Sequence, residues 1–281
     1  MNANEIDRIA QLVCQTNGYE LLAFVGSGAF KRTFQVKLPA GDSVALKVFA
    51  PGFSRERTER EIDAMKRCSH PGVARLIDIF VVEDNGVSYT VTTEEYLPDG
   101  TLAAQMADRG LLPPNYVRLL GRHLINALSH VASLDLVHRD IKPENIMFRG
   151  DRPVIVDFGL VRDLGASSLT QTWLANGPGT PLYASPEQLL NRKSLIDWRS
   201  DQFSLAVMLS ICAFGDHPFA ANSSMGETID SVMKRRGPTP AFMAGAEQAG
   251  LKSLIRMASP WPVDRFRTTT MLAEAWETQS N

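Results

Sequence analysis

Two short polar segments constrain this chain more than any other feature. The first has the sequence HRDIKPEN (138–145) and places a carboxylate, an ammonium and an amide at fixed offsets on one loop. Twelve residues past Asn145 comes the second, Asp157-Phe158-Gly159, directly after the apolar run Val154–Val156. A single tripeptide of this kind would be unspecific. Eight residues followed at a fixed distance by a second motif are specific, and together they indicate one chemical centre.

The rest of the chain divides by pattern into a β-type part and a helical part. Short β-type runs fill residues 19–48, 73–82 and 87–93, broken by turn sequences such as Gly26-Ser27-Gly28. Helical patterns cover 5–13, with Asn4 as the expected N-cap, and 54–67; beyond a turn at 97–100 they cover 114–133, 201–213 and 247–258. The pattern predicts a small β-rich lobe followed by a larger helical lobe.

These motifs and their order resemble the eukaryotic-type serine/threonine protein kinase family, which includes bacterial members. The resemblance runs from about Tyr19 to about Ala275, nearly the whole chain. It implies an α+β, bilobal kinase-like fold with two lobes sharing an active-site cleft. By this resemblance, residues 1–18 are expected to form an amphipathic extension, 19–96 the N-lobe and 97–281 the C-lobe of one kinase domain.

The resemblance assigns the chemistry to four side chains of the polar segments. Asp140 is the expected base or orienting group for an acceptor hydroxyl, and Lys142 is expected to offset charge on the transferring γ-phosphoryl group. Asn145 and Asp157 are the expected ligands of Mg²⁺, with Mn²⁺ as an alternative, because hard cations prefer oxygen ligands. A merely structural polar turn is the competing interpretation.

ATP is the expected nucleotide, bound through a glycine-rich turn and a strand lysine. Glycines let backbone amides approach phosphates closely, and Lys47 of the VALK strand (44–47) is expected to contact the α- and β-phosphates. Alone, these two features would be a turn and an exposed lysine. The full expected set is Gly26, Ser27, Gly28, Ala45, Lys47, Glu61, Glu95, Leu97 and Met147.

A carboxylate is expected to hold the Lys47 ammonium. Glu61 is preferred, because it lies nine residues before His70-Pro71, the family's spacing from that helix to the next strand. Glu59 is the fallback.

The segment GTPLYASPE (179–187) resembles the end of the family's activation segment. Glu187 is expected to pair with Arg265, a structural role, since buried ion pairs fix geometry more reliably than they add stability. Asp201 is expected to accept hydrogen bonds from the catalytic-loop backbone, to cap its own helix, or both.

Regulation and acceptor preference follow from the same resemblance. Arg139 beside Asp140 is expected to bind a phosphate on the activation segment, with Thr170 or Thr172 as the autophosphorylated residue. A mobile polar loop is the alternative. Lys142 and Thr180 together go with serine or threonine acceptors in the family.

Three positions depart from the family pattern. Lys31 replaces the third glycine of the phosphate loop, and Thr33 replaces a small apolar residue. Glu94 falls at the gatekeeper position, where a buried carboxylate without a partner would be costly. If the alignment slips by one residue, the gatekeeper is Thr93.

The net charge, the cysteines and the length of the apolar runs limit the expected binding partners and the expected cellular compartment. Twenty-nine basic and 31 acidic residues give a net charge of −2, which requires neither nucleic acid nor an anionic membrane. Three cysteines without metal-ligand spacing fit a reducing compartment, and no apolar run is long enough to span a bilayer, so a cytoplasmic location is expected. The expected partners are a protein substrate with a Ser/Thr acceptor and a transient second copy for autophosphorylation. The alternatives are a pseudokinase scaffold and a small-molecule kinase. Small-molecule kinases on a related fold lack a GTPxYxxPE segment, and this chain has one.

Overall fold

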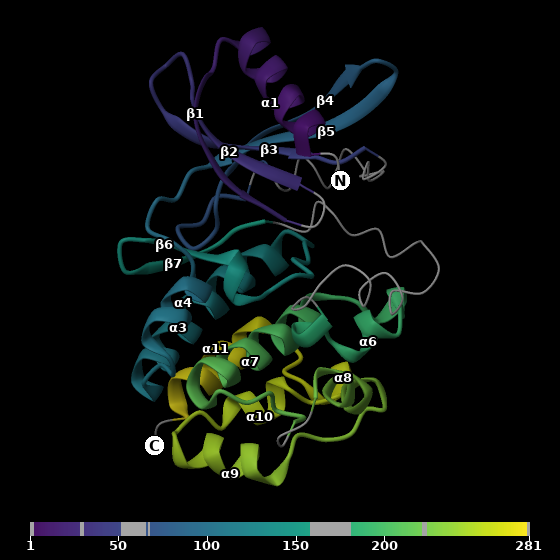
Figure 1. Ribbon diagram of the computed structural model, residues 1–281. Coiled ribbons are helices and arrows are strands. Elements are labelled where there is room, and N and C mark those ends of the chain that lie inside the picture. Colours follow the sequence, from purple (N-terminus) through teal and green to yellow (C-terminus); the bar gives the residue numbers. More distant parts are fainter. Residues whose placement is uncertain are drawn as a thin grey trace. The chain divides into compact units, whose positions relative to one another are not determined.

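The computed structural model describes residues 3–28, 31–51, 66, 68–157, 181–220 and 224–279. The chain forms two compact units (Figure 1). The described residues of the first unit run to Pro98, and those of the second begin at Asp99.

The described part of the first unit includes helix α1 and a five-stranded sheet. Helix α1 spans Ala3–Asn17, and the strands are β1 (Glu20–Ser27), β2 (Lys31–Lys37), β3 (Ser43–Phe49), β4 (Leu76–Asp84) and β5 (Val87–Glu95). Every neighbouring pair is antiparallel, and the strand order is β1-β2-β3-β5-β4. The β-type runs of the sequence are therefore strands, as predicted.

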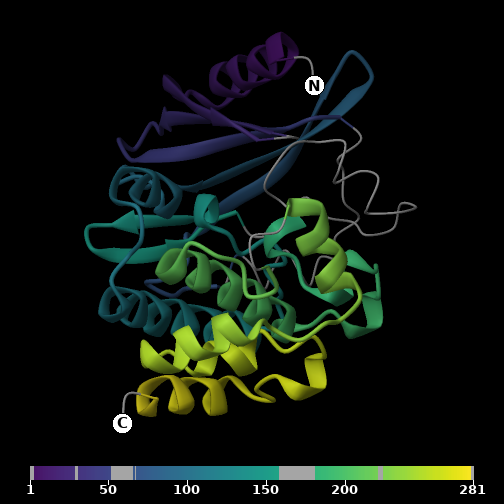
Figure 2. The same cartoon turned by 60° about the horizontal axis from the view of Figure 1, so that its bottom comes forward.

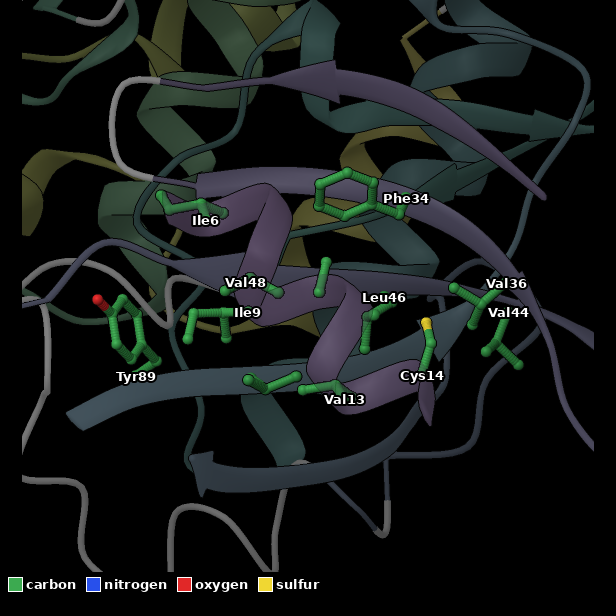
Figure 3. Close-up of a cluster of buried hydrophobic side chains, with 12 residues drawn as sticks. Ile6, Ile9, Val13, Cys14, Phe34, Val36, Val44, Leu46, Val48 and Tyr89 are labelled. Atoms are coloured by element: carbon green, nitrogen blue, oxygen red, sulfur yellow. The ribbon is translucent and has the colours of Figure 1, made fainter. Parts of the chain in front are cut away.

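Helix α1 covers one face of this sheet (Figure 3). Its apolar side repeats at helical spacing, with Ile6, Ile9 and Val13 among its buried residues, which is why it packs on β2, β3 and β5. The buried set is Ile6, Ile9, Ala10, Val13, Cys14, Phe34, Val36, Val44, Leu46, Val48, Tyr89 and Val91. The prediction that Asn4 caps the helix is wrong, because the helix already includes Ala3 and extends to Asn17.

Strand register decides which side chains share the other face. Lys47 lies opposite Thr92, and Ala45 lies opposite Glu94, whereas Leu46 lies opposite Thr93. Because successive side chains point to opposite faces, Leu46 under α1 places Thr93 on the α1 side and leaves Glu94 on the face of Lys47. This excludes the alignment in which Thr93 takes the place of Glu94.

The described part of the second unit is mainly helical and contains a two-stranded sheet (Figures 1 and 2). Its elements are α3 (Leu102–Arg109), α4 (Pro114–Ser133), β6 (Ile146–Arg149), β7 (Arg152–Ile155), α6 (Pro186–Leu189), α7 (Trp198–Phe214), α8 (Met225–Met233), α9 (Pro240–Gln248), α10 (Ser253–Met257) and α11 (Thr269–Thr278). Short 3-10 helices span Pro143–Asn145, Pro181–Tyr183, Lys193–Leu195 and Pro262–Asp264. Helix α7 is buried along most of its length and packs against α4 and α10.

Two predicted helices differ from the structure. Helix α7 begins at Trp198 instead of residue 201, because Asp197 caps it by accepting the Arg199 N–H at 2.8 Å. The single helix predicted for 247–258 is wrong: α9 ends at Gln248, Gly250 adopts a left-handed φ of +67°, and α10 begins at Ser253. Among the described helices, none is both long and apolar enough to cross a bilayer.

Candidate active site

Two side chains of the 138–145 loop contact the carboxylate of a third, Asp140. The Lys142 ammonium lies 3.0 Å from Asp140 Oδ2. Asn145 Nδ2 donates to the same oxygen at 3.0 Å and to the Asp140 carbonyl at 2.8 Å. The Asp140 side chain keeps 23% of its surface exposed. Asp140 is thus oriented by two donors and still accessible to a reacting group.

The hairpin β6–β7 brings the two expected metal ligands to one end. Ile146 pairs with Ile155, and the Val156 N–H donates to the Asn145 carbonyl at 2.9 Å, so Asn145 and Asp157 flank the same end of the ladder. The hydrogen bonds that the Asn145 amide makes to Asp140 both use Nδ2, and its Oδ1 is an acceptor by chemistry. An amide oxygen and a carboxylate are suitable donors for Mg²⁺, so the residues present fit the metal.

The Asp201 carboxylate holds the start of the 138–145 loop by accepting two of its backbone N–H groups. Its Oδ2 accepts the His138 N–H and its Oδ1 accepts the Arg139 N–H, both at 2.7 Å. Burial raises the pKa of Asp201 to about 7, while the two N–H donors and Arg139 act in the opposite direction. Since Asp197 caps α7, Asp201 supports the loop and does not cap the helix.

His138 ties the loop to the strand that precedes Asp157. The ring is fully buried, with Nε2 2.9 Å from the Val156 carbonyl, while Nδ1 accepts the Asp140 N–H at 3.3 Å. A carbonyl oxygen only accepts, so Nε2 carries the proton and the ring is neutral. Burial lowers the pKa of His138, which favours the neutral ring.

Two of the six described non-glycine residues with positive φ lie in these two segments. Arg139 and Asp157 have φ values of +68° and +63°, a left-handed conformation that non-glycine residues adopt infrequently. Strain of this kind persists where the surrounding contacts determine the conformation, and it is typical of functional sites.

Gln188 is a supporting residue that the sequence reasoning missed. Its Oε1 accepts the backbone N–H and the hydroxyl of Ser185, at 3.1 and 2.9 Å, and its Nε2 donates to the Arg139 carbonyl at 2.8 Å. The signal was present as the spacing Ser185-x-x-Gln188, a capping-box pattern. Ser185, which replaces the family's usual alanine, therefore helps to hold Gln188 against the loop.

The expected ion pair between Glu187 and Arg265 is present and fully buried. Arg265 donates to the two carboxylate oxygens at 2.7 and 3.1 Å, and Ser200 Oγ donates to Oε1 at 2.7 Å. Burial acts to raise the pKa of Glu187, but the Arg265 charge and the hydrogen bonds outweigh it and hold the pKa below its ordinary value.

In the first unit, Lys47 contacts a carboxylate that the sequence reasoning did not assign to it. Its ammonium lies 2.5 Å from Glu94 Oε2, and Thr92 Oγ1 donates to Glu94 Oε1 at 3.1 Å. Both members of the ion pair are buried. The expected cost of burying Glu94 without a partner is thus avoided, because the partner is Lys47.

The described part of the glycine-rich turn lies at the paired ends of strands β1 and β2. Gly26 pairs with Thr33 after a register shift, and the Gly28 N–H donates to the Lys31 carbonyl at 2.9 Å. The Lys31 ammonium, whose position the sequence left open, lies 6.0 Å from the centre of the Phe49 ring.

The remaining expected nucleotide contacts lie in both units. Ala45 shares the Lys47 face, the Glu95 N–H donates to the Arg75 carbonyl at 2.9 Å, and Leu97 is buried. In the second unit, Met147 pairs with Val154 in the β6–β7 sheet.

Several predicted residues lie outside the described part of the chain. These are Glu59 and Glu61, the Phe158 and Gly159 of the second polar segment, and the candidate regulatory residues Thr170, Thr172 and Thr180.

Comparisons with known proteins agree with this fold and site. The model of the protein kinase domain family matches residues 19–276. The probable serine/threonine-protein kinase PkwA of Thermomonospora curvata is 34% identical over 227 residues, covering 79% of this chain and 29% of that protein. The serine/threonine-protein kinase AfsK of Streptomyces coelicolor is 31% identical over 225 residues, covering 78% of this chain and 27% of that protein.

A solved structure shows the same fold. The kinase domain of Mycobacterium tuberculosis PknI, in a mutant form with one cysteine replaced by alanine, has a TM-score of 0.69 at 25% identity and covers 94% of this chain and 96% of that one. The fold and the oriented Asp140 are those of a protein kinase domain. This chain belongs to the protein kinase domain family, and it spans less than a third of the length of either curated relative.

Proposed function

We propose that this chain is an active protein kinase that transfers the γ-phosphoryl group of ATP to serine or threonine hydroxyls of proteins. The observation that carries the proposal is the oriented carboxylate of Asp140, which accepts from Lys142 and Asn145 and stays accessible. Residues 19–96 and 97–281 are proposed to be the N-lobe and C-lobe of one kinase domain.

The proposed reaction needs positioning more than strong basicity. The acceptor oxygen forms a bond to the γ-phosphorus while the bond to the β-phosphate oxygen breaks, and ADP leaves. Asp140 orients the hydroxyl and takes its proton late, because the transition state of phosphoryl transfer is loose. Lys142, next to Asp140, offsets charge on the transferring group. Mg²⁺, held by Asn145 and Asp157, would supply charge neutralisation for the phosphates when bound.

Serine and threonine are the proposed acceptors. Lys142 two residues after Asp140, and Thr180 before Pro181, match the family's serine/threonine pattern. The two curated relatives above carry names of serine/threonine kinases.

We also propose that phosphorylation of Thr170 or Thr172, in trans between two copies, activates the enzyme. Among the described residues, the buried Nε of Arg139 has no hydrogen-bond partner, and a phosphate oxygen would supply one. Mass spectrometry of fully active protein should find phosphate in this segment. Full activity without phosphate there would contradict the proposal.

A reducing, ATP-containing compartment is proposed as the working location. Cys14, Cys68 and Cys212 are free and buried, as expected where disulfides do not form.

Incubation of purified protein with labelled ATP and Mg²⁺, beside Asp140→Ala and Lys47→Ala variants, tests the proposed activity. Label on serine or threonine in the wild type, with a loss on the order of 10²-fold or more in Asp140→Ala, is expected. Bound nucleotide without transfer would indicate a pseudokinase scaffold. Transfer to small alcohols but not to proteins would indicate a small-molecule kinase.

A further inference from the structure

We propose that Glu94 is a positioning residue for phosphoryl transfer: a carboxylate fixed in the sheet that holds the Lys47 ammonium for the nucleotide phosphates. The proposal rests on the proposed kinase activity and adds a residue that the family pattern does not assign. In this proposal, the carboxylate at the gatekeeper position acts on the reaction by positioning Lys47.

The contacts of Glu94 use both of its oxygens. Lys47 Nζ lies 2.5 Å from Oε2, and Thr92 Oγ1 donates to Oε1 at 3.1 Å. The side chains of Lys47 and Glu94 are each only 7% exposed. A carboxylate with both oxygens engaged, in a buried position, has one orientation, and it imposes that orientation on the ammonium.

The sheet makes this arrangement rigid. Lys47 lies on β3 and Glu94 on β5, two adjacent strands that each have neighbours on both sides. Thr92 lies directly opposite Lys47, so all three groups project from one face, while α1 packs on the other. Groups held on paired strands are placed more precisely than groups on loops.

The contact with Glu94 is compatible with binding of the Lys47 ammonium to nucleotide phosphates. A lysine ammonium has three donors, so a contact with one carboxylate oxygen does not exhaust its capacity to bind phosphate oxygens. The contact with Glu94 limits the directions in which the ammonium can donate, and it orders the long lysine side chain before the nucleotide binds. Preorganised charge of this kind acts on the transition state and lowers the barrier, so its removal is expected to reduce kcat.

The test compares Glu94→Gln with wild type and with Glu83→Gln, a matched control on the exposed part of β4. The measurements are kcat and KM for ATP in peptide phosphorylation, and the Kd of adenosine, which has no phosphate for Lys47 to contact. We expect Glu94→Gln to lower kcat about tenfold or more, with the adenosine Kd within about twofold of wild type. Glu94→Asp, which keeps the charge with a shorter reach, should recover part of the lost kcat.

Three outcomes would overturn the proposal. A kcat of Glu94→Gln within about twofold of wild type would make Glu94 a purely structural counter-ion. An increased kcat would mean that Glu94 restrains Lys47. Loss of adenosine binding together with kcat, in both Glu94→Gln and Glu94→Asp, would mean that Glu94 only shapes the fold. Failure of the wild type to transfer phosphate would instead overturn the proposed function, so the two failures are distinct.

Discussion

Two ion pairs in the described part of the chain place opposite charges together in buried positions. Lys47 and Glu94 lie in the sheet of the first unit, and Glu187 and Arg265 lie among the helices of the second. Taking charges out of water is costly, and removing one member of such a pair leaves the other uncompensated. Single substitutions at these positions are therefore expected to destabilise the fold, and double substitutions that remove both charges test whether the ion pair is the cause.

Lys47→Met should destabilise the fold by about 3–5 kcal/mol, because it leaves the Glu94 carboxylate buried without its partner. Lys47→Met/Glu94→Leu removes both charges and should recover most of that loss. The measurement is the free energy of unfolding in urea for the two variants and the wild type. A double variant as unstable as the single one would show that the pair is not the source of the effect.

His217 should make the second unit sensitive to acid. Burial lowers the pKa of His217 to about 4, and both ring nitrogens are engaged, with the Leu182 carbonyl at 3.0 Å and the Phe219 N–H at 3.1 Å. Between pH about 6.5 and about 4 the unfolded chain binds a proton at this histidine and the folded chain does not, so stability falls as the pH falls. The full effect is about 3 kcal/mol.

Urea unfolding at a pH of about 7 and of about 4.5 measures this effect. Wild type should lose more stability than His217→Gln over that interval. Equal losses in the two proteins would assign the acid sensitivity to other groups, such as His138, whose pKa burial lowers in the same direction.

At the scale of elements, helix α1 packs on the five-stranded sheet and lies outside the region matched by the family model. It packs its apolar side on β2, β3 and β5, and it is joined to the sheet by Tyr89, whose hydroxyl donates to Glu5 at 2.5 Å, and by an ion pair between Arg32 and Asp7 at 2.6 Å. The face of the sheet opposite Lys47 is thus covered within the chain itself.

Ile9→Ala should cost about 2–5 kcal/mol of stability, because Ile9 is completely buried in this contact and its truncation leaves a cavity. Gln11→Ala, at an exposed position of the same helix, should have little effect. Amide hydrogen exchange of β2 and β3 is the measurement, since it reports on the first unit directly. Equal exchange rates in the two variants would mean that α1 does not stabilise the sheet.

Two helical glycines provide a matched pair in the second unit. A Cβ on Gly121 of α4 would come within 2.2 Å of the Trp276 ring of α11, whereas a Cβ on Gly245 of α9 would meet nothing within 4 Å. Gly121→Ala should therefore destabilise by about 1–3 kcal/mol or more, through overpacking. Gly245→Ala should stabilise by about 0.5–1 kcal/mol, because alanine is the better helix former.

Tryptophan fluorescence during unfolding separates these two variants. All four tryptophans lie at residue 173 or beyond, so the signal comes from the second unit. Stabilisation by Gly121→Ala would show that α4 and α11 can shift apart at no cost.

The sequence predicts elements well where one periodic pattern determines them. The bounds of α4, residues 114–133, agree with the apolar period of that stretch, and the strands follow their β-type runs. The break at Gly250 was missed, because an apolar run on both sides of a glycine looks continuous in sequence. Long-range partners such as Lys47 and Glu94 were missed because they depend on strand register, which the pattern of a single strand does not specify.

Over the whole molecule, acidic and basic residues nearly cancel, with a net charge of −2. A polyanionic nucleotide therefore gains little from the overall field, and its binding has to depend on local groups such as Lys47 and on a metal ion that offsets the phosphates. This makes dependence on Mg²⁺ a property to test on the intact folded chain.

A non-hydrolysable ATP analogue with Mg²⁺, at about 100 times its Kd, should raise the free energy of unfolding by about 2.7 kcal/mol, because it binds only the folded chain. Chelation of Mg²⁺ should remove much of this gain. Asp157→Asn should abolish the Mg²⁺-dependent part, since it removes the carboxylate proposed to bind the metal, while asparagine tolerates the φ of +63° at this position. Asp135→Asn is the control, because Asp135 is exposed and has a similar φ of +57°. A shift in Tm with Mg²⁺ that is equal in both variants would exclude Asp157 as the metal ligand.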